Sequence, residues 1–293
     1  MPVSHPLTER APAKINLTLH VLGRRADGYH ELESLVAFSR SGDVLTLLPG
    51  DEFKFEIDGP MAAAAGDPPQ NLVVKAVRHL AERVSGLKLG TLHLKKELPV
   101  AAGIGGGSSD AAAALRLVVR ANGIAPDDPR LTDAAQATGA DVPVCLATQA
   151  RTMTGIGERL GPVLSLPPLP TLIVNPRLPL ATKAVFAQMR ERRGSAAGLR
   201  AHPRISSGLD FEALIDLLRK GRNDLEDAAC VLAPIIGDVL AILAAARGCK
   251  FARMSGSGTT CFGIFTDCRA VGRAKKTILD AHPDWWVKSA MLN

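Results

Sequence analysis

The chain has 293 residues, of which 46% are hydrophobic, 22% charged and 4% aromatic, and its formal net charge is +6. This length allows two packed units, because a single hydrophobic core usually stops growing at roughly 250 to 300 residues. The composition is that of an ordinary globular protein, and no apolar run approaches the roughly 18 residues that a membrane span needs. The scarcity of aromatic side chains argues against a single-strand nucleic-acid binder, whose bases stack on such rings.

Residues 1–10 lack the basic start and the apolar stretch of a signal peptide, which predicts a protein that is not exported. The five cysteines are odd in number and contain no Cys-x-x-Cys pair, which argues against a disulfide framework or a structural zinc site. Both features favour a cytoplasmic location. The mild positive charge suits an anionic small substrate, and nothing in the sequence indicates a protein partner, a nucleic acid or a membrane.

The apolar pattern predicts several strands in the first part of the chain. Residues 12–21 alternate apolar and other side chains, which is typical of a half-buried strand. The stretches DVLTLLPG, FKFEIDG and GTLHLKKEL are expected to form further strands, separated by glycine and proline. Residues 71–84 instead carry apolar side chains at helical spacing, and Asn71 is placed to cap that helix. The N-terminal part is therefore expected to be rich in sheet.

A second region of predicted elements begins near Thr171. The stretches TLIVNP, CFGIF and WWVKSAM predict strands. Helices are expected from Thr182, over FEALIDLLRKG with its end at Gly221, over roughly residues 234–246, and over about 270–282. This mixture predicts an α+β protein with two lobes.

Between two of these helices, the segment 190–208 carries five arginines among small residues. Such a segment could bind an anion as a flap over a site. Its composition favours a solvated loop instead.

Residues 99–115, PVAAGIGGGSSDAAAAL, place four glycines within five positions, before two serines and an aspartate. Glycines let backbone N–H groups converge without obstruction by side chains, and the start of a following helix adds a partial positive charge. A loop of this kind between a strand and a helix is typical of phosphate binding. Ser108, Ser109 and Asp110 stand where the capping residue of that helix is expected, and the Asn-Gly pair at 122–123 is expected to end it.

Two well-known nucleotide-binding patterns do not match this loop. A P-loop requires a lysine directly after its last glycine, and none follows here. A dinucleotide-binding fingerprint requires a third glycine at the position of Ser108. A simple tight turn would need one or two glycines and no pair of hydroxyl groups, so phosphate binding is favoured over a purely structural turn.

The loop resembles the ATP-binding motif of the GHMP kinase superfamily, P-x-x-x-G-L-G-S-S-A, with Ile104 in place of the leucine. Three further stretches resemble one branch of that superfamily: PAKINLTLHVLGRRADGYHELES, GADVPVC at 139–145 and MSGSGTTCFGIF at 254–265. These matches follow one another in order along most of the chain, so chance similarity in one motif does not explain them. The resemblance implies phosphorylation of the 2-hydroxyl of 4-(cytidine-5'-diphospho)-2-C-methyl-D-erythritol, in the non-mevalonate route to isoprenoid precursors.

The resemblance also implies a two-lobed α+β GHMP kinase fold. Its N-terminal lobe contains sheet and helices, its C-terminal lobe is ferredoxin-like, and its active site lies in the cleft between them. We expect these lobes at residues 1–160 and 161–293. ATP is the implied phosphoryl donor and Mg²⁺ its companion. The implied ATP-binding residues are Pro99, Gly103, Gly105, Gly106, Gly107, Ser108 and Ser109.

Phosphoryl transfer to an alcohol requires in-line placement of the hydroxyl, neutralisation of phosphate charge, and often a carboxylate that takes the hydroxyl proton. The superfamily branch uses a lysine and an aspartate at the reacting hydroxyl, and these match Lys14 and Asp141. The resemblance implies that Asp141 is the general base and that Lys14 keeps it ionised and stabilises the transferring phosphoryl group. Taken singly, Lys14 would be an exposed strand lysine, opposite Ile15, and Asp141 a turn aspartate; the combination of motifs favours catalysis.

The resemblance implies that Tyr29 and His30, in the stretch DGYHELE, bind the cytidyl group, and the two side chains suit that role because Tyr29 offers a flat face and His30 a hydrogen-bonding edge. Asn16 lies on the same strand face as Lys14 and is expected to bond the methylerythritol end. Phe186 is a weaker candidate for the opposite face of the cytosine, since a core position is the simpler interpretation. The resemblance implies four more substrate-binding residues in the second glycine motif, which by itself would be read as a turn: Gly256, Ser257, Gly258 and Thr259.

Two alternative functions stay open on the sequence. A GHMP kinase for another small alcohol, such as homoserine or mevalonate, explains the glycine loop but not Tyr29 and His30 beside GADVP. A noncatalytic nucleotide-binding sensor would have no use for Lys14 and Asp141. The sequence shows no cage of carboxylates, so no residue is assigned to a metal, although Ser109 is the nearest candidate ligand for Mg²⁺.

Overall fold

The computed structural model describes residues 5–193 and 201–293. The chain forms two compact units, each made of segments that are separated in sequence. Unit 1 is Met1–Lys14, Ser41–Val100 and Gly105–Thr148, and unit 2 is Ile15–Arg40, Ala101–Ile104 and Gln149–Asn293. The first and third strands, β1 (Leu7–Asn16) and β3 (His30–Leu48), therefore contribute residues to both units.

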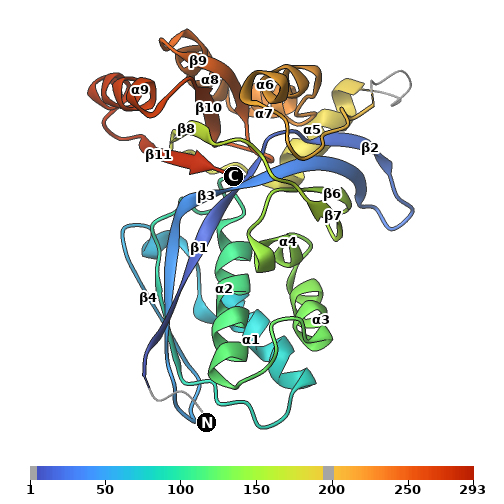
Figure 1. Ribbon diagram of the computed structural model, residues 1–293, viewed down its shortest axis with the longest axis vertical. Helices are drawn as coiled ribbons and strands as arrows, with labels where there is room; N and C mark the ends of the chain where they lie inside the picture. Colours follow the sequence, from blue (N-terminus) through green and yellow to red (C-terminus); the bar gives the residue numbers. More distant parts are fainter. Residues whose placement is uncertain (1–4, 194–200) are drawn as a thin grey trace. The chain divides into compact units, whose positions relative to one another are not determined.

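The sheet of unit 1 is built around β5 (Thr91–Lys95), whose neighbours β3 and β4 (Lys54–Asp58) are labelled in Figure 1. This strand pairs antiparallel with the second half of β3 and parallel with β4. Side chains two positions apart on a strand point to the same face, and one face of this sheet is closed to solvent. Its fully buried leucines are Leu45, Leu47, Leu92 and Leu94.

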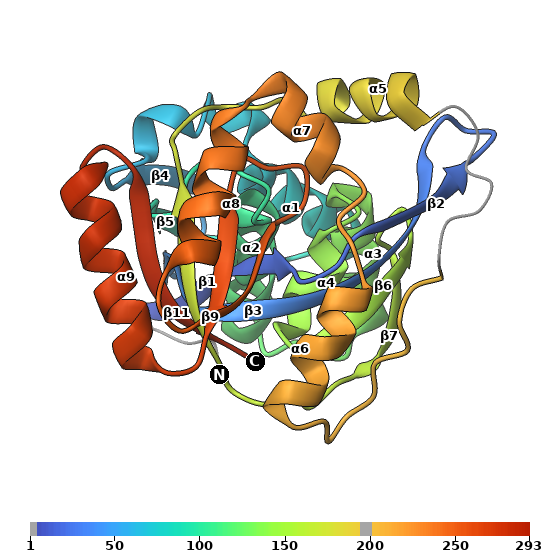
Figure 2. The same cartoon turned by 90° about the horizontal axis from the view of Figure 1, so that it is seen from above.

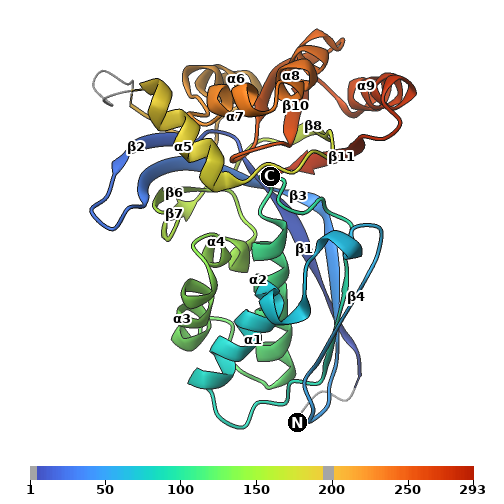
Figure 3. The same ribbon diagram turned by 180° about the vertical axis from the view of Figure 1, so that it is seen from behind.

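Four α-helices of the described residues belong to unit 1: α1 (Leu72–Arg83), α2 (Gly106–Ala121), α3 (Pro129–Thr138) and α4 (Val142–Ala147). Two short 3-10 turns, at Ala62–Ala64 and Pro68–Gln70, precede α1. Helix α1 packs on α2 and α3, and α2 packs on α4 (Figure 3). The predicted cap of α1 is confirmed, because the side chain of Asn71 accepts a hydrogen bond from the N–H of Val73.

The start of α2 differs from the sequence expectation. The helix begins at Gly106, and Gly105 occupies the N-cap with a φ of 60°. The prediction that Ser108, Ser109 or Asp110 caps this helix was therefore wrong, since all three lie in its first turns. A left-handed residue favours glycine, so the glycines themselves turn the chain into the helix. The helix ends as expected, with Asn122 at the C-cap and a positive φ at the next residue.

Unit 2 contains an antiparallel sheet in the order β11-β8-β10-β9. These strands are β8 (Leu169–Asn175), β9 (Cys249–Met254), β10 (Cys261–Phe265) and β11 (Trp286–Leu292). Every residue of the two inner strands β8 and β10 is buried. Continuous burial is expected where helices or other elements cover both faces of a strand.

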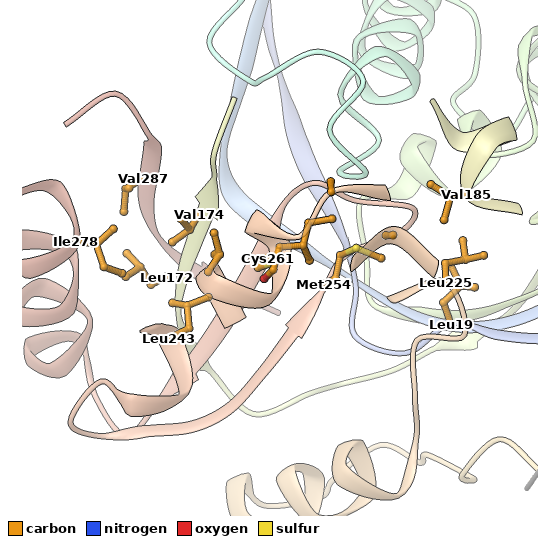
Figure 4. Packing of buried hydrophobic residues seen from close by; sticks show 14 of the residues in the cluster. Leu19, Leu172, Val174, Val185, Leu225, Leu243, Met254, Cys261, Ile278 and Val287 are labelled. Carbon is orange, nitrogen blue, oxygen red and sulfur yellow. The ribbon is translucent and has the colours of Figure 1, made fainter. Parts of the chain in front are cut away.

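Five helices of the described residues belong to unit 2: α5 (Thr182–Arg193), α6 (Phe211–Lys220), α7 (Glu226–Leu232), α8 (Ile235–Ala245) and α9 (Cys268–Ala281). Helix α8 packs on β9 and β10, and α9 packs on β8 and β11 (Figure 2). Leu172 and Val174 of β8 gather with Ile278 of α9 and Leu243 of α8 in the hydrophobic core of the unit (Figure 4). Gly221 ends α6, as predicted.

The first half of β3 joins another antiparallel group in unit 2, in the order β2-β3-β6-β7. Its other members are β2 (His20–Arg24), β6 (Arg151–Gly155) and β7 (Arg159–Val163). The single half-buried strand predicted over residues 12–21 was wrong in two respects. The strand is interrupted after Asn16, and every residue from 11 to 21 is buried, polar ones included. Alternating apolar side chains therefore did not mark an exposed face here.

The five cysteines are all free. None of the helices described is long and apolar enough to cross a membrane. Of the arginine-rich segment 190–208, residues 194–200 lie outside the described residues, so the interpretation as a loop stays a prediction.

Candidate functional site

Lys14 and Asp141 lie together in unit 1, as the sequence predicted. The ammonium of Lys14, near the end of β1, is 2.6 Å from Oδ2 of Asp141. The Lys14 side chain is only 4% exposed, whereas that of Asp141 is 39% exposed. Asp141 stands directly before α4, yet its carboxylate makes no capping hydrogen bond to that helix. A buried cation thus holds a carboxylate that stays open to solvent.

Lys14 also lies against the glycine loop. A Cβ atom placed on Gly105 would be 3.1 Å from Cβ of Lys14 and 3.2 Å from its Cε. Together with the positive φ of Gly105, this close approach restricts the position to glycine. The same lysine therefore contacts the start of α2 and the carboxylate of Asp141.

The start of α2 has the features of an anion site. The first N–H groups of a helix have no partner within the helix and carry partial positive charge. Ser108 is half-buried and Pro99 is buried. The hydroxyl of Ser109 is buried and has no hydrogen-bond partner among the described residues. A buried hydroxyl without a partner is unfavourable, so a ligand oxygen or a cation would complete its bonding.

A second lysine in unit 1 was missed by the sequence reasoning. The ammonium of Lys96 is 2.5 Å from Oδ2 of Asp43 and 2.6 Å from Oδ2 of Asp110. All three side chains are at most 5% exposed. Oδ1 of Asp43 accepts hydrogen bonds from the backbone N–H groups of the two residues that follow Lys96. A Cβ on Gly106 would lie 3.3 Å from the Lys96 ammonium, so this cluster lies beneath the glycine loop.

The charges of this cluster are unequal, with two carboxylates for one ammonium. Burial lowers the pKa of Lys96, but the two carboxylates outweigh it and raise that pKa above its ordinary value. Burial, with the nearby charge of Asp43, outweighs the ammonium and holds the pKa of Asp110 well above its ordinary value. Lys96 and Asp110 flank the glycine motif in sequence, which was an available signal. Asp43 comes from β3, and only the fold brings it there.

Cys145 is the nucleophilic side chain next to the Lys14–Asp141 pair. It is fully buried in α4, and burial raises the pKa of its thiol to about 12. Because the thiolate rather than the thiol is the nucleophile, this cysteine is inert at neutral pH. The chemistry available at this point is that of the carboxylate and the ammonium.

Unit 2 holds Asn16, which follows Lys14 by two residues on β1. Its backbone N–H donates to Oγ of Ser255 at 3.0 Å, and its side-chain Nδ2 donates to Oγ of Ser34 at 2.8 Å. The hydroxyl of Ser255 donates in turn to the carbonyl oxygen of Gly103 at 2.9 Å. Neither serine was predicted from the sequence, because their roles depend on contacts across more than one strand.

The first glycine of the loop packs against the second glycine motif. A Cβ on Gly103 would lie 2.4 Å from the carbonyl oxygen of Ser255, and a Cβ on Gly256 would lie 2.7 Å from that of Gly103. Gly103, Gly256 and Gly258 all have positive φ values. The structure thus shows a close approach of two backbones that explains the glycines at 103 and 256.

The remaining residues of this second motif are tied to α5 and to the loop between β8 and α5. The hydroxyls of Ser257 and Thr182 are 2.8 Å apart, and the hydroxyl of Thr259 donates to the carbonyl oxygen of Leu178. The side-chain amide of Asn223 donates to the carbonyl oxygens of Met254 and Gly256. These bonds hold the motif in one conformation.

Tyr29 and His30 differ in their surroundings. Tyr29 is 60% exposed. The ring of His30 stacks on that of Phe186, with ring centroids 4.6 Å apart and planes 20° apart. Phe186 also packs against the hydrophobic core of unit 2. The structure therefore brings together two of the three rings that the sequence singled out and leaves the tyrosine ring accessible.

Family models match two segments of the chain. Residues 71–149 match the N-terminal domain of GHMP kinases, and residues 204–282 match their C-terminal domain. The two matches together span more than half of the chain. They lie on either side of the lobe boundary at residues 160–161, which stays a prediction.

Individual relatives extend over nearly the whole chain. A protein of Methylorubrum extorquens (strain PA1) named 4-diphosphocytidyl-2-C-methyl-D-erythritol kinase is 53% identical, over 98% of this chain and 99% of its own length. A crystal structure of 4-(cytidine 5'-diphospho)-2C-methyl-D-erythritol kinase is similar with a TM-score of 0.75 and 32% identity, over 98% of this chain and 99% of the other. A homoserine kinase structure from Cytophaga hutchinsonii is similar over 98% of this chain and 95% of its own, with a TM-score of 0.69. Its identity is only 18%, so this similarity shows the fold alone.

Proposed function

This chain belongs to the GHMP kinase family, and we propose that it transfers the γ-phosphoryl group of ATP to the 2-hydroxyl of 4-(cytidine-5'-diphospho)-2-C-methyl-D-erythritol. One observation carries the proposal: Lys14 contacts both the glycine at the start of α2 and the carboxylate of Asp141. An anion site and a candidate base are thereby joined by one cation. The identity of 53% to a relative named for this substrate favours it over other alcohols. We expect the reaction to take place in the cytoplasm.

The phosphates of ATP are assigned to the start of α2. Gly105 is the N-cap and Gly106 and Gly107 begin the helix, and the partial positive charge of the helix start favours an anion. The residues described contain no group of three or more histidines, cysteines or carboxylates that could hold a metal ion. Mg²⁺ would therefore be held mainly by the nucleotide phosphates, whose charge it offsets. The unpartnered hydroxyl of Ser109 fits such a cation or a phosphate oxygen.

Asp141 is assigned as the general base. Its carboxylate is accessible enough to accept the proton of the acceptor hydroxyl, and it lies 2.6 Å from the ammonium of Lys14. The hydroxyl oxygen forms a bond to the γ-phosphorus, the bond from that phosphorus to the bridging oxygen of ADP breaks, and the proton moves to Asp141. Lys14 stabilises the negative charge on the transferring group.

The cytidyl end of the substrate is assigned to Tyr29 and His30. Tyr29 offers an exposed aromatic face for the cytosine, and the stack of His30 on Phe186 fixes the imidazole plane beside it. Asn16 is assigned to the methylerythritol end, and Gly256, Ser257, Gly258 and Thr259 are assigned to substrate binding as a rigid turn.

The test of this function is ADP release by the purified protein with Mg-ATP and each of four alcohols: the cytidyl methylerythritol, homoserine, mevalonate and galactose. We expect turnover with the first alone, and a new phosphomonoester at its 2-position in the phosphorus NMR spectrum. Turnover with another alcohol would contradict the substrate, and ATP binding without any turnover would indicate a nucleotide sensor.

The cytidyl assignment has its own test in Tyr29→Ala. Loss of the exposed ring should raise KM for the cytidyl substrate about tenfold, since stacking on an aromatic side chain contributes roughly 1 to 3 kcal/mol per base. KM for ATP should stay within about twofold. Leu22→Ala, which removes another exposed apolar side chain of unit 2, serves as the control. An unchanged KM for the cytidyl substrate would contradict the assignment of Tyr29.

A further inference from the structure

Asn16 is fixed at two points within unit 2. Its backbone N–H donates to Oγ of Ser255, and its side-chain Nδ2 donates to Oγ of Ser34. Asn16 is 5% exposed and Ser34 is 3% exposed. The first bond holds the backbone of Asn16 and the second holds its side chain, so the direction in which the buried amide faces is determined by its hydrogen bond to Ser34.

The hydrogen bonds of Ser34 determine that direction. Oγ of Ser34 lies 2.5 Å from the carbonyl oxygen of Thr18, which can only accept a hydrogen bond. The single proton of the Ser34 hydroxyl is therefore donated to Thr18. Toward Asn16, Oγ of Ser34 can act only as an acceptor, so the amide must present its NH₂ group there.

Thr18 is itself firmly held, which makes Ser34 a rigid support. The Thr18 hydroxyl accepts a hydrogen bond from the N–H of Leu35 at 2.9 Å and is 2.7 Å from Nε2 of His202. Thr18 is fully buried and His202 is 8% exposed. The orientation of the Asn16 amide thus rests on a chain of buried hydrogen bonds rather than on one contact.

From these contacts we infer that Ser34 is a positioning residue, which fixes the amide of Asn16 so that its Oδ1 accepts a hydrogen bond from a hydroxyl of the acceptor substrate. No hydrogen bond within the described parts of the chain ends on this oxygen. The inference rests on the proposed function, and it adds the direction of the hydrogen bond between the substrate and Asn16. Asn16 selects a hydroxyl, which donates, over an ether or a keto oxygen, which only accepts.

The first test is Ser34→Ala. Without the acceptor, the amide can turn over, and KM for the cytidyl substrate should rise about tenfold, the size of coupling expected between residues in contact. KM for ATP and kcat should stay within about twofold. Ser34→Thr keeps the hydroxyl and should restore KM. Thr171→Val removes another buried hydroxyl, which donates to the carbonyl oxygen of Leu169, and should leave KM unchanged.

The decisive form of this test is a double-mutant cycle. If Ser34 acts through the Asn16 amide, Ser34→Ala should change KM less than about 1.5-fold when Asn16 is already alanine. If Ser34→Ala raised KM for the cytidyl substrate equally with Asn16 present and with alanine in its place, the inference would be overturned. The same holds if Ser34→Ala alone raised KM for ATP as much as KM for the cytidyl substrate. Where Ser34→Ala does not fold, Ser34→Cys keeps the volume and weakens both bonds, and the same pattern is expected.

A second readout separates this inference from the proposed function. Nitrogen-15 NMR of the wild-type protein should show the Asn16 side-chain NH₂ protected from hydrogen exchange, and Ser34→Ala should remove that protection. An unprotected NH₂ in the wild type, or protection that survives Ser34→Ala, would overturn the inference. Absence of turnover with the cytidyl substrate would contradict the proposed function alone, because the NMR result does not depend on turnover.

Discussion

Unit 1 contains two lysine–aspartate constellations that differ mainly in access to solvent. Lys14 has one carboxylate partner, and that partner is 39% exposed. Lys96 has two carboxylate partners, and all three side chains are sealed. Both lysines lie against a glycine of the same loop, Lys14 at Gly105 and Lys96 at Gly106.

The comparison indicates which pair can take part in a reaction. A base must reach the proton that it removes, and only Asp141 is open to a ligand. The Lys96 cluster instead ties β3 and the residues that follow β5 to α2, and its three side chains are at most 5% exposed. We therefore assign the Lys14–Asp141 pair to the proposed chemistry and the Lys96 cluster to the architecture of the loop.

The largest expected effect comes from the sealed cluster. Lys96→Met should lower the free energy of unfolding by about 3 to 5 kcal/mol, because removing one partner leaves buried carboxylates without compensation. Chemical denaturation monitored by circular dichroism measures this. The control is Lys95→Met, since Lys95 is exposed and its ion pair with Glu97 contributes little. A loss below about 1 kcal/mol for Lys96→Met would contradict the structural role.

The open pair should respond in activity rather than in stability. Lys14→Met keeps the stem that packs on Gly105 but removes the charge, and kcat should fall about 100- to 1,000-fold. The melting temperature should change little, because the exposed Asp141 can be solvated by water. Steady-state kinetics and thermal unfolding on the same sample separate the two effects. A kcat near that of the wild type would remove Lys14 from the mechanism.

His20 in unit 2 offers a pH-dependent contrast to these ion pairs. It is fully buried, and burial, followed by the charges of Arg222 and His202, lowers its pKa from 6.5 to about 4. Between these values the unfolded chain binds more protons than the folded one, so stability should fall as pH drops from 6.5 to 4. The difference of 2.5 pH units corresponds to about 3 kcal/mol.

The variant that tests this is His20→Gln. Its side-chain oxygen can accept the hydrogen bond that the backbone N–H of Arg222 now donates to Nε2 of His20. The free energy of unfolding, measured by denaturation at several pH values between 4 and 7, should change less with pH in this variant than in the wild type, by about 3 kcal/mol at most. His79→Gln, at a partly exposed histidine of α1, should retain the wild-type slope. Equal slopes for the wild type and His20→Gln would contradict a neutral buried His20.

The smallest effect is expected at Asp110. Two carboxylates share one ammonium in the sealed cluster. Burial raises the pKa of the Asp110 carboxyl, which means that burial disfavours its negative charge, and Asp110→Asn removes that charge. Its unfolding free energy at pH 7 should stay within about 1 kcal/mol of the wild type. Asp43→Asn should lose about 1 to 3 kcal/mol more, because Asp43 accepts hydrogen bonds with both oxygens, from two backbone N–H groups and from Lys96, and an amide has only one acceptor oxygen. The reverse order would show that Asp110 holds the cluster together.

The two constellations also show how far the sequence could lead. Lys14 and Asp141 lie 127 positions apart, and only the resemblance to a family paired them in advance; the structure places their charges 2.6 Å apart. Periodicity located most helices and strands of both units. It failed over residues 12–21, because both faces of that segment are covered and polar residues are buried with the apolar ones.

Other parts of the site depend on tertiary contacts that no local pattern records. Asp43 follows an unremarkable Ser-Gly pair in sequence, and its role exists only because β3 runs beside β5. In sequence, nothing distinguishes Ser34 and Ser255 from other serines of strands and loops. Their role becomes visible only in their hydrogen bonds to Asn16. The start of α2 was misplaced because a capping serine was expected where the glycines themselves make the turn.

A rapid-quench measurement of single-turnover phosphoryl transfer in Asp141→Asn separates a role of Asp141 in chemistry from a role in binding. With both substrates saturating, we expect the chemical step to slow at least about 100-fold, as for loss of a general base, while both dissociation constants and the melting temperature stay near those of the wild type. A chemical step of wild-type rate in the folded variant would contradict the role in chemistry.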